Sequence, residues 1–224
     1  MTALLFSACA AISPSLDYTP GVVAETISSP VSVSFSSGEQ GVSAQGYILY
    51  KRPDKFHLVI LSPFGTTIFE AYSLGERILI IYPAHSVAYI GNIREMPDET
   101  RVQGLKMIPW IMDADPSPDR NFTGKTARVR SDGINEEILF SNGLVASKKT
   151  ERGDIAYYSD YTLFGGVALA KTLELVNRQG DTIRISLSDP EINSAIEETA
   201  FTPRLDGITL LPLQDIGWKQ DRKE

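Results

Sequence analysis

Short runs in which apolar and polar residues alternate recur along most of the chain, with turn residues between them. Val31 to Ser36 alternates strictly, and residues 182–188 place Ile and Leu on one face and polar residues on the other. Asn142-Gly143 lies between two such runs and is typical of a tight hairpin turn. The predicted strands span residues 31–36, 42–50, 56–61, 66–72, 77–82, 86–90, 135–140, 144–150, 155–164, 168–177 and 182–188. Consecutive hairpins predict one antiparallel, strongly curved sheet of about eleven strands.

The segment from Met96 to Asp113 has a different pattern, with few β signals and several large apolar residues. It predicts one or two short helices that are interrupted near Pro109. Several predicted strands are apolar on both faces, so one face of the sheet needs a cover, and this segment is the predicted cover. A further helical turn is predicted over residues 193–199.

Composition indicates one globular domain. The chain has 224 residues, of which 42% are hydrophobic, and its formal net charge is −7. This acidic balance argues against a nucleic acid as the partner. The short basic pairs Lys51-Arg52 and Lys148-Lys149 are interpreted as solvated strand ends.

Motifs for catalysis or metal binding fail on inspection. Gly124-Lys125-Thr126 resembles the end of a phosphate-binding loop, but Asp119 occupies the position that requires glycine. The Asp-rich stretch from Asp113 resembles the start of a calcium loop, but Pro118 stands at its sixth position and Gly124 at its twelfth. The two histidines have no neighbouring second ligand. We therefore expect no enzyme activity, no catalytic residue, no metal and no cofactor.

The N-terminal residues suggest an export signal. Phe6-Ser7-Ala8-Cys9 resembles a bacterial lipobox, in which cleavage precedes a cysteine that then carries acyl chains. Residues 1–8 are then a residual signal segment, residues 9–30 a lipidated flexible tether, and residues 216–224 a charged tail. The apolar run is short and has no basic region, so we expect the true start to lie upstream. Alternatively, Cys9 is a chance residue in a frayed terminus.

Residues 46–91 carry a resemblance to a known family. A strand, the sequence Arg52-Pro53-Asp54-Lys55-Phe56, a strand, the turn Ser62-Pro63-Phe64-Gly65 and three more strands follow in order. This order resembles the LolB/LolA-like family of lipoprotein-handling proteins of Gram-negative envelopes. Trp110-Ile111 followed by Asp and Pro, and Pro190-Glu191-Ile192-Asn193, are also similar to family members.

The resemblance implies a half-open barrel of about eleven strands over residues 31–215, capped by short helices. Its apolar interior would bind acyl chains. From the alternation, the cavity-lining residues are predicted to be Leu58, Ile60, Phe69, Ile80 and Trp110, and the alternative for each of them is a place in the ordinary core. Phe64, between Pro63 and Gly65, stands where the family has a protruding apolar side chain that enters the membrane. The alternative for Phe64 is an aromatic ring folded back onto a neighbouring strand.

The predicted function is that of a monomeric outer-membrane lipoprotein that faces the periplasm and is anchored through Cys9. The outer membrane is implied because Ala10 and Ala11, rather than Asp, follow the cysteine. The protein would bind or transfer lipid or the acyl part of lipoproteins and could receive them from a soluble LolA-like carrier. The alternative is a non-enzymatic binding or assembly module of the envelope, which a fully packed interior would favour.

Overall fold

The computed structural model describes residues 16–38, 40–97 and 103–216. The prediction of a mainly β domain is confirmed, but these residues form fourteen strands rather than about eleven. The strands are β1 Thr26–Ser37, β2 Gln40–Lys51, β3 Lys55–Leu61, β4 Thr67–Leu74, β5 Arg77–Tyr82, β6 Val87–Asn92, β7 Gly124–Val129, β8 Asn135–Ser141, β9 Leu144–Thr150, β10 Ile155–Phe164, β11 Val167–Val176, β12 Thr182–Leu187, β13 Glu191–Ile192 and β14 Thr209–Pro212.

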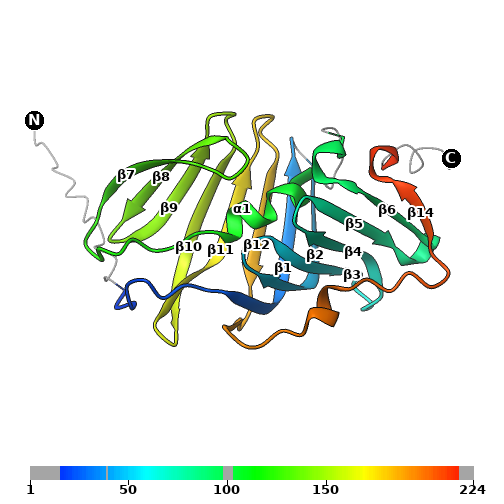
Figure 1. Cartoon of the computed structure of the whole chain (residues 1–224), viewed down its shortest axis with the longest axis horizontal. Helices are drawn as coiled ribbons and strands as arrows, with labels where there is room; N and C mark the ends of the chain where they lie inside the picture. The colour runs from blue at the N-terminus through cyan, green and yellow to red at the C-terminus, as the bar shows by residue number, and fades with distance from the viewer. Residues whose placement is uncertain (1–15, 39, 98–102, 217–224) are drawn as a thin grey trace, which may run out of the picture.

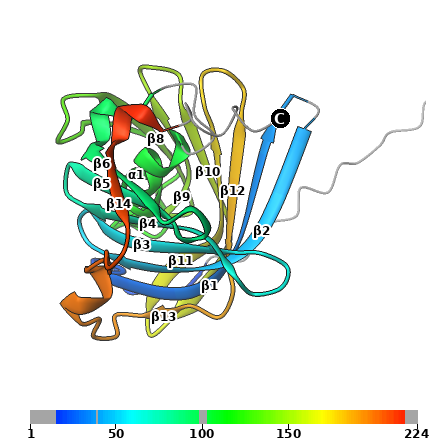
Figure 2. The ribbon, with the colours of Figure 1, turned by 90° about the vertical axis from the view of Figure 1, so that its right-hand side faces the viewer.

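One continuous sheet contains all of these strands. Its order is β14-β6-β5-β4-β3-β2-β1-β12-β11-β10-β9-β8-β7, and β13 pairs with β1 beside this path. Neighbours are antiparallel except β14 and β6, which are parallel. The two edge strands, β7 and β14, do not pair with each other, so the sheet curves around α1 without closing (Figures 1 and 2).

The three strands that the alternation missed lack the usual signals. Five of the six residues of β7 are exposed, so the strand shows no apolar face. β13 has only two residues. β14 pairs in parallel with β6, which is far away in the chain, so no hairpin turn connects the two strands.

The prediction that short helices cover the sheet is confirmed, but the predicted interruption near Pro109 is wrong. The 3-10 helix η3, Gln103–Met107, leads directly into α1, Ile108–Met112. Pro109 lies in the first turn of α1 instead of interrupting a helix, because the first helical N–H groups need no partner within the helix. α1 lies on the concave side of the sheet (Figure 1), and its apolar side chains belong to the main core. The other short 3-10 helices are η1 Pro83–His85, η2 Ile93–Glu95, η4 Glu198–Phe201 and η5 Leu213–Asp215.

The convex side has a second apolar cluster, which the sequence did not predict. Tyr72, Leu79, Ile81 and Ala88 alternate along β4, β5 and β6 with residues of the main core, so they face the opposite side. The segment that follows β13 runs along this outer side and covers it (Figure 2). Phe201 of η4 is buried there. In the described residues, each face of this half of the sheet therefore has its own cover.

The last part of the predicted tether, residues 9–30, is packed against the domain. β1 begins at Thr26, five residues before the first predicted strand. Tyr18 is buried, and its hydroxyl donates to the carbonyl of Ser117 at 2.7 Å. Cys9, the residual signal segment and most of the charged tail lie outside the described residues. The helices within the described ranges are all too short or too polar to traverse a bilayer.

His57 connects the sheet to this outer cover. Its ring stacks on Tyr72 at 4.0 Å, its Nδ1 lies 3.0 Å from the carbonyl of Ala200, and its Nε2 lies 3.3 Å from Glu70. Burial lowers the pKa of His57 below 6.5, and it outweighs the opposing effect of Glu70. The unfolded chain therefore binds this proton more readily than the folded chain at weakly acidic pH.

The sign of this linkage gives a prediction. The contribution of His57 is complete above pH 6.5 and is lost as the pH falls through 6.5 toward the lower pKa of the folded state. Urea unfolding at pH 7.5 and pH 5.5 should show a smaller loss of stability in His57→Gln than in the parent. His85→Gln, at an exposed site, is the matched control and should keep the parental loss. An equal loss in all three proteins would contradict the assignment.

Candidate functional site on the concave side of the sheet

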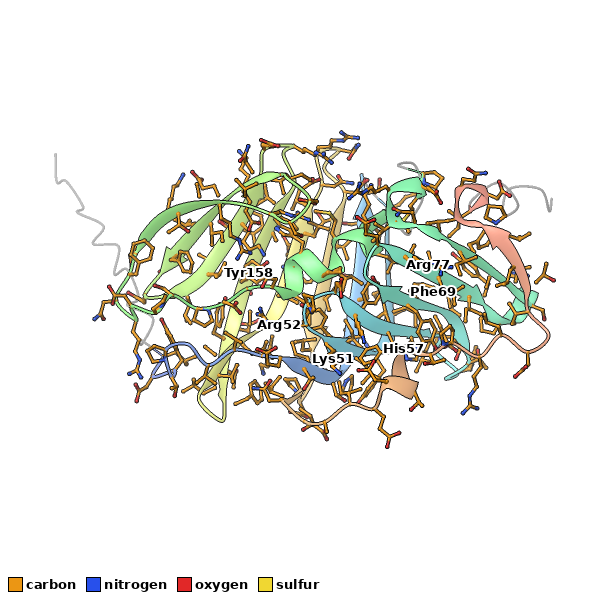
Figure 3. All side chains as sticks on the ribbon, in the orientation of Figure 1. Lys51, Arg52, His57, Phe69, Arg77 and Tyr158 are labelled. Carbon is orange, nitrogen blue, oxygen red and sulfur yellow. The ribbon has the colours of Figure 1, made fainter. Side chains whose placement is uncertain are left out.

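The predicted cavity residues lie together on the concave side but do not line a cavity. Leu58 and Ile60 on β3, Ile80 on β5 and Trp110 on α1 are buried at no more than 5% exposure in one apolar cluster, and Phe69 on β4 packs against it half-buried. Alternation therefore identified the correct face of the sheet. The expectation that these side chains surround an open space is corrected, because α1 fills that space. Figure 3 shows Phe69 and Tyr158 on the two halves of the sheet, on either side of α1.

Lys148, on strand β9, holds the C-terminal end of α1 in place. Its side chain is completely buried, and its ammonium donates to the carbonyl oxygens of Trp110 and Asp113, both at 2.6 Å. Tyr158 donates to the carbonyl of Ile111 at 3.0 Å. These carbonyls belong to the last turn of a helix, where no backbone partner is available. Burial lowers the pKa of Lys148 to about 8, although Glu136 and Asp113 oppose this effect.

Trp110 joins the same buried network through its ring nitrogen. The indole N–H donates to Glu136, and that carboxylate also accepts from Arg128. The Lys148 ammonium lies 5.1 Å from the centre of the indole ring, and the Arg130 guanidinium lies 5.3 Å from it. These contacts hold α1 in one orientation. The space between α1 and the sheet is a packed core.

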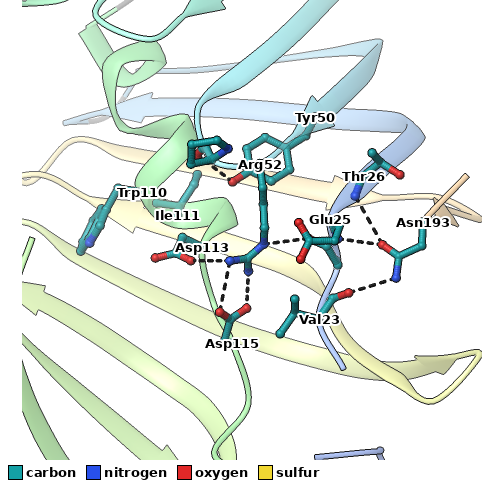
Figure 4. Close-up of polar contacts among 12 residues, drawn as sticks. Val23, Glu25, Thr26, Tyr50, Arg52, Trp110, Ile111, Asp113, Asp115 and Asn193 are labelled. Atoms are coloured by element: carbon teal, nitrogen blue, oxygen red, sulfur yellow. Dashed lines mark hydrogen bonds and ion pairs between the residues drawn. The ribbon is translucent and has the colours of Figure 1, made fainter. Parts of the chain in front are cut away.

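Arg52, which follows β2, contacts both the segment before β1 and the segment after α1 (Figure 4). Its Nε donates to the carbonyl of Ala24 at 2.9 Å, and its guanidinium contacts Asp113 at 3.1 Å and also Asp115. Burial would raise the pKa of Asp113, but Lys148, Arg128 and Arg52 outweigh it and hold the pKa below its usual value. The interpretation of Lys51-Arg52 and Lys148-Lys149 as solvated strand ends is thus wrong for Arg52 and Lys148.

The Asp-rich stretch that resembles a calcium loop uses its first carboxylates in these ion pairs. Asp113 pairs with Arg52 and Arg128, and Asp115 pairs with Arg52. Within the described ranges, no three His, Cys, Asp or Glu residues are grouped as ligands for a metal ion.

A cleft of about 780 Å³ opens beside α1, and the sequence did not predict it. Hairpin turns of the C-terminal half form one wall, the β4–β5 turn and η2 form the other, and η3 lies between them. This volume lies in the range of small-molecule sites. Its apolar lining consists of Phe35, Ile93, Met107, Pro109, Ile134, Leu175 and Ile183. Its charged lining consists of Asp54, Glu76, Arg94, Lys106, Arg130, Asp132, Arg152, Asp154, Arg178 and Asp181.

The turn between β3 and β4 projects an apolar side chain into solvent. Phe64 is 93% exposed, so the alternative in which its ring folds back onto a strand is wrong. Pro63 and Gly65 are exposed as well, and Gly65 adopts a φ of 79°, which favours glycine. Hydrogen bonds from Gly65 N to Ser62 O at 2.9 Å and from Ser62 N to Thr66 O at 2.8 Å close the turn. The tip is thus well defined although its side chain has no apolar neighbour to cover it.

Comparison with known proteins gives similarity of fold only. No family model matches the chain, and no curated protein matches its sequence. A DUF1329 family protein from Desulfovibrio piger superposes with a TM-score of 0.57 at 12% identity, covering 80% of this chain and 90% of that one. A LolA superfamily protein from Nitrosomonas europaea superposes with a TM-score of 0.56 at 12% identity, covering 80% and 91%.

A third solved structure is similar with a lower TM-score. A putative outer membrane lipoprotein-sorting protein domain from Vibrio parahaemolyticus superposes with a TM-score of 0.50 at 10% identity, covering 79% of this chain and 89% of that one. The chain therefore shares its overall fold with a LolA superfamily protein and with a lipoprotein-sorting domain.

Proposed function

We propose that this protein is a non-enzymatic protein of the bacterial envelope that binds the acyl part of a lipid or lipoprotein. The observation that carries the proposal is the cleft of about 780 Å³ beside α1, whose lining is partly apolar, in a fold shared with a lipoprotein-sorting domain. Each methylene of an acyl chain that leaves water contributes about 0.8 kcal/mol. An acyl chain that covers the half-buried apolar side chains of this lining would therefore gain free energy on binding.

The finer role that we propose is LolB-like transfer at the outer membrane. Cys9 would carry the lipid anchor on the periplasmic side, and the Pro63-Phe64-Gly65 tip would enter the membrane while cargo passes from a soluble carrier. An exposed Phe at a closed turn supports this role because its burial is favourable only in an apolar environment outside the domain. The domain would act as a monomer, without metal or cofactor.

The acyl-binding proposal is tested by native mass spectrometry of the purified full chain, with and without added dodecanoate. The parent should retain co-purified lipid or take up dodecanoate. Phe35→Glu should lose this binding because it places a charge among the apolar lining residues of the cleft. Val42→Glu is the matched control, since Val42 pairs with Phe35 across the β1–β2 ladder, is 67% exposed and does not line the cleft. Absence of all lipid from the parent would overturn the proposal.

The transfer tip is tested separately. Phe64→Glu should weaken binding of the full chain to phospholipid vesicles by about tenfold or more, because burying a Phe side chain contributes about 1.5–3 kcal/mol. Its stability should stay within about 0.5 kcal/mol of the parent, as expected for an exposed position. Val129→Glu on the edge strand β7, also well exposed at 66%, is the control and should bind vesicles as the parent does. Equal vesicle binding by Phe64→Glu and the control would dismiss a role for the tip.

The packed interior favours a second candidate, a binding or assembly module that carries no lipid. In that case Leu58, Ile60 and Trp110 would serve as ordinary core, as their burial allows. A parent protein that binds no acyl chain in the native mass spectra, yet assembles with other envelope proteins, would support this candidate.

A further inference from the structure

Three hairpin turns of the C-terminal half bring the same pair of residue types to the cleft. The β7–β8, β9–β10 and β11–β12 turns each place one Arg and one Asp in its lining. These pairs are Arg130 with Asp132, Arg152 with Asp154, and Arg178 with Asp181. One wall of the cleft therefore carries a row of guanidinium and carboxylate groups, and the same cleft has apolar lining residues as well.

The carboxylates in this row are engaged within their own turns. Asp132 accepts from the backbone N–H of Ile134 at 3.2 Å, as Asp commonly does in turns. Asp154 accepts from the hydroxyl of Thr150 at 3.3 Å. Asp181 accepts from the side-chain amide of Asn177 at 3.0 Å. Their negative charge is thus partly satisfied before any ligand arrives.

The guanidinium groups differ in what they contact. Arg130 pairs with Asp132 at 3.0 Å and lies over the Trp110 ring, so it belongs to the network that holds α1. Arg152 is exposed and makes no ion pair with any residue that the structure describes. The neighbouring turn lies close to it, because a Cβ added at Gly153 would lie 3.7 Å from the Cβ of Arg178. The β9–β10 and β11–β12 turns are therefore neighbours, and Arg152 and Arg178 both line the cleft.

An arginine fork is suited to the oxygens of a phosphate group, which it can bind through two parallel hydrogen bonds. The chain as a whole is acidic, with a net charge of −7, so its long-range field does not attract anions. Preference for an anion at this place must come from local contacts. The same cleft is lined by the half-buried Phe35 and Ile183, which offer apolar surface to a chain attached to the same ligand.

We propose that the cleft binds one phospholipid molecule, with its phosphate on Arg152 and Arg178 and an acyl chain on the apolar part of the lining. This inference rests on the proposed acyl-binding function and adds a headgroup to it. The cleft should therefore bind a phospholipid in preference to an acyl chain that carries no phosphate.

The test is isothermal titration calorimetry of the delipidated full chain with three probes: dioctanoyl phosphatidic acid, dioctanoylglycerol and inorganic phosphate. Phosphatidic acid should bind about tenfold more tightly than dioctanoylglycerol, or better, as expected for hydrogen bonds to a charged group. Inorganic phosphate alone should bind far more weakly than the lipid. Arg152→Glu should abolish the preference for phosphatidic acid. Lys149→Glu, an exposed site on the adjoining strand outside the cleft, should keep it.

The outcomes separate the two proposals. Equal binding of phosphatidic acid and dioctanoylglycerol would overturn the headgroup site and leave acyl binding intact. Binding of inorganic phosphate as tight as that of the lipid would show an anion site and overturn the phospholipid assignment. An unchanged preference in Arg152→Glu would overturn the assignment to these arginines. Binding of neither lipid would overturn both the headgroup site and the proposed function.

Discussion

Replacement of Lys148 with alanine is expected to lower the free energy of unfolding by about 3–5 kcal/mol, because it removes a buried charge together with its two hydrogen bonds. Lys148 is fully buried, and its ammonium is the donor to the carbonyls of both Trp110 and Asp113. Without it, these carbonyls lose their partner and the buried Glu136 loses a nearby positive charge. Urea unfolding followed by circular dichroism measures the difference.

Lys149→Ala is the matched control for this prediction. Lys149 is the next residue on β9 and is exposed, so its replacement should change the stability by no more than about 0.5 kcal/mol. A loss below about 1 kcal/mol in Lys148→Ala would contradict the role given to its buried hydrogen bonds.

Replacement of Trp110 with alanine is expected to cost about 3–5 kcal/mol, as is usual for a large aromatic residue in a core. Trp110 is 5% exposed and packs within the main apolar cluster. Trp110→Phe separates the two contributions, since it keeps most of the apolar area but removes the N–H that donates to Glu136. We expect this variant to lose about 1–3 kcal/mol, because a buried carboxylate loses a hydrogen bond.

A double-mutant cycle tests whether the two residues act as one network. The Lys148 ammonium lies 5.1 Å from the centre of the Trp110 ring, and both side chains interact with Glu136. Their effects should therefore not add, and the coupling should exceed about 0.5 kcal/mol. Additive effects of Trp110→Ala and Lys148→Ala would contradict a shared side-chain network.

The strands were predictable where apolar and polar residues alternate between turns. All eleven predicted strands correspond to observed ones, namely β1 to β6 and β8 to β12. β7 was not predictable because an edge strand with both faces toward solvent has no apolar period. β14 was not predictable because its pairing with β6 joins segments more than one hundred residues apart and depends on the course of the outer cover.

The candidate site was predictable only in part. Alternation placed Leu58 and Ile60 on the inner face, but it cannot tell whether inner residues meet a helix or an empty space. The cleft is lined by residues from turns, such as Arg152 and Asp154, which carry no periodicity. Lys148 and Lys149 are identical residues side by side, and only the fold decides that the first is buried and the second exposed.

The central claim is that an acyl chain occupies the cleft beside α1 and not the packed interior. The most direct measurement is methyl NMR of the isoleucine side chains of the full chain during titration with dodecanoate. Ile134 and Ile183 line the cleft, whereas Ile48 and Ile80 lie in the core and are completely buried. We predict progressive shifts of the Ile134 and Ile183 methyl signals while those of Ile48 and Ile80 stay unchanged. Shifts confined to Ile48 and Ile80, or no shift at Ile134 and Ile183 at saturating dodecanoate, would contradict it.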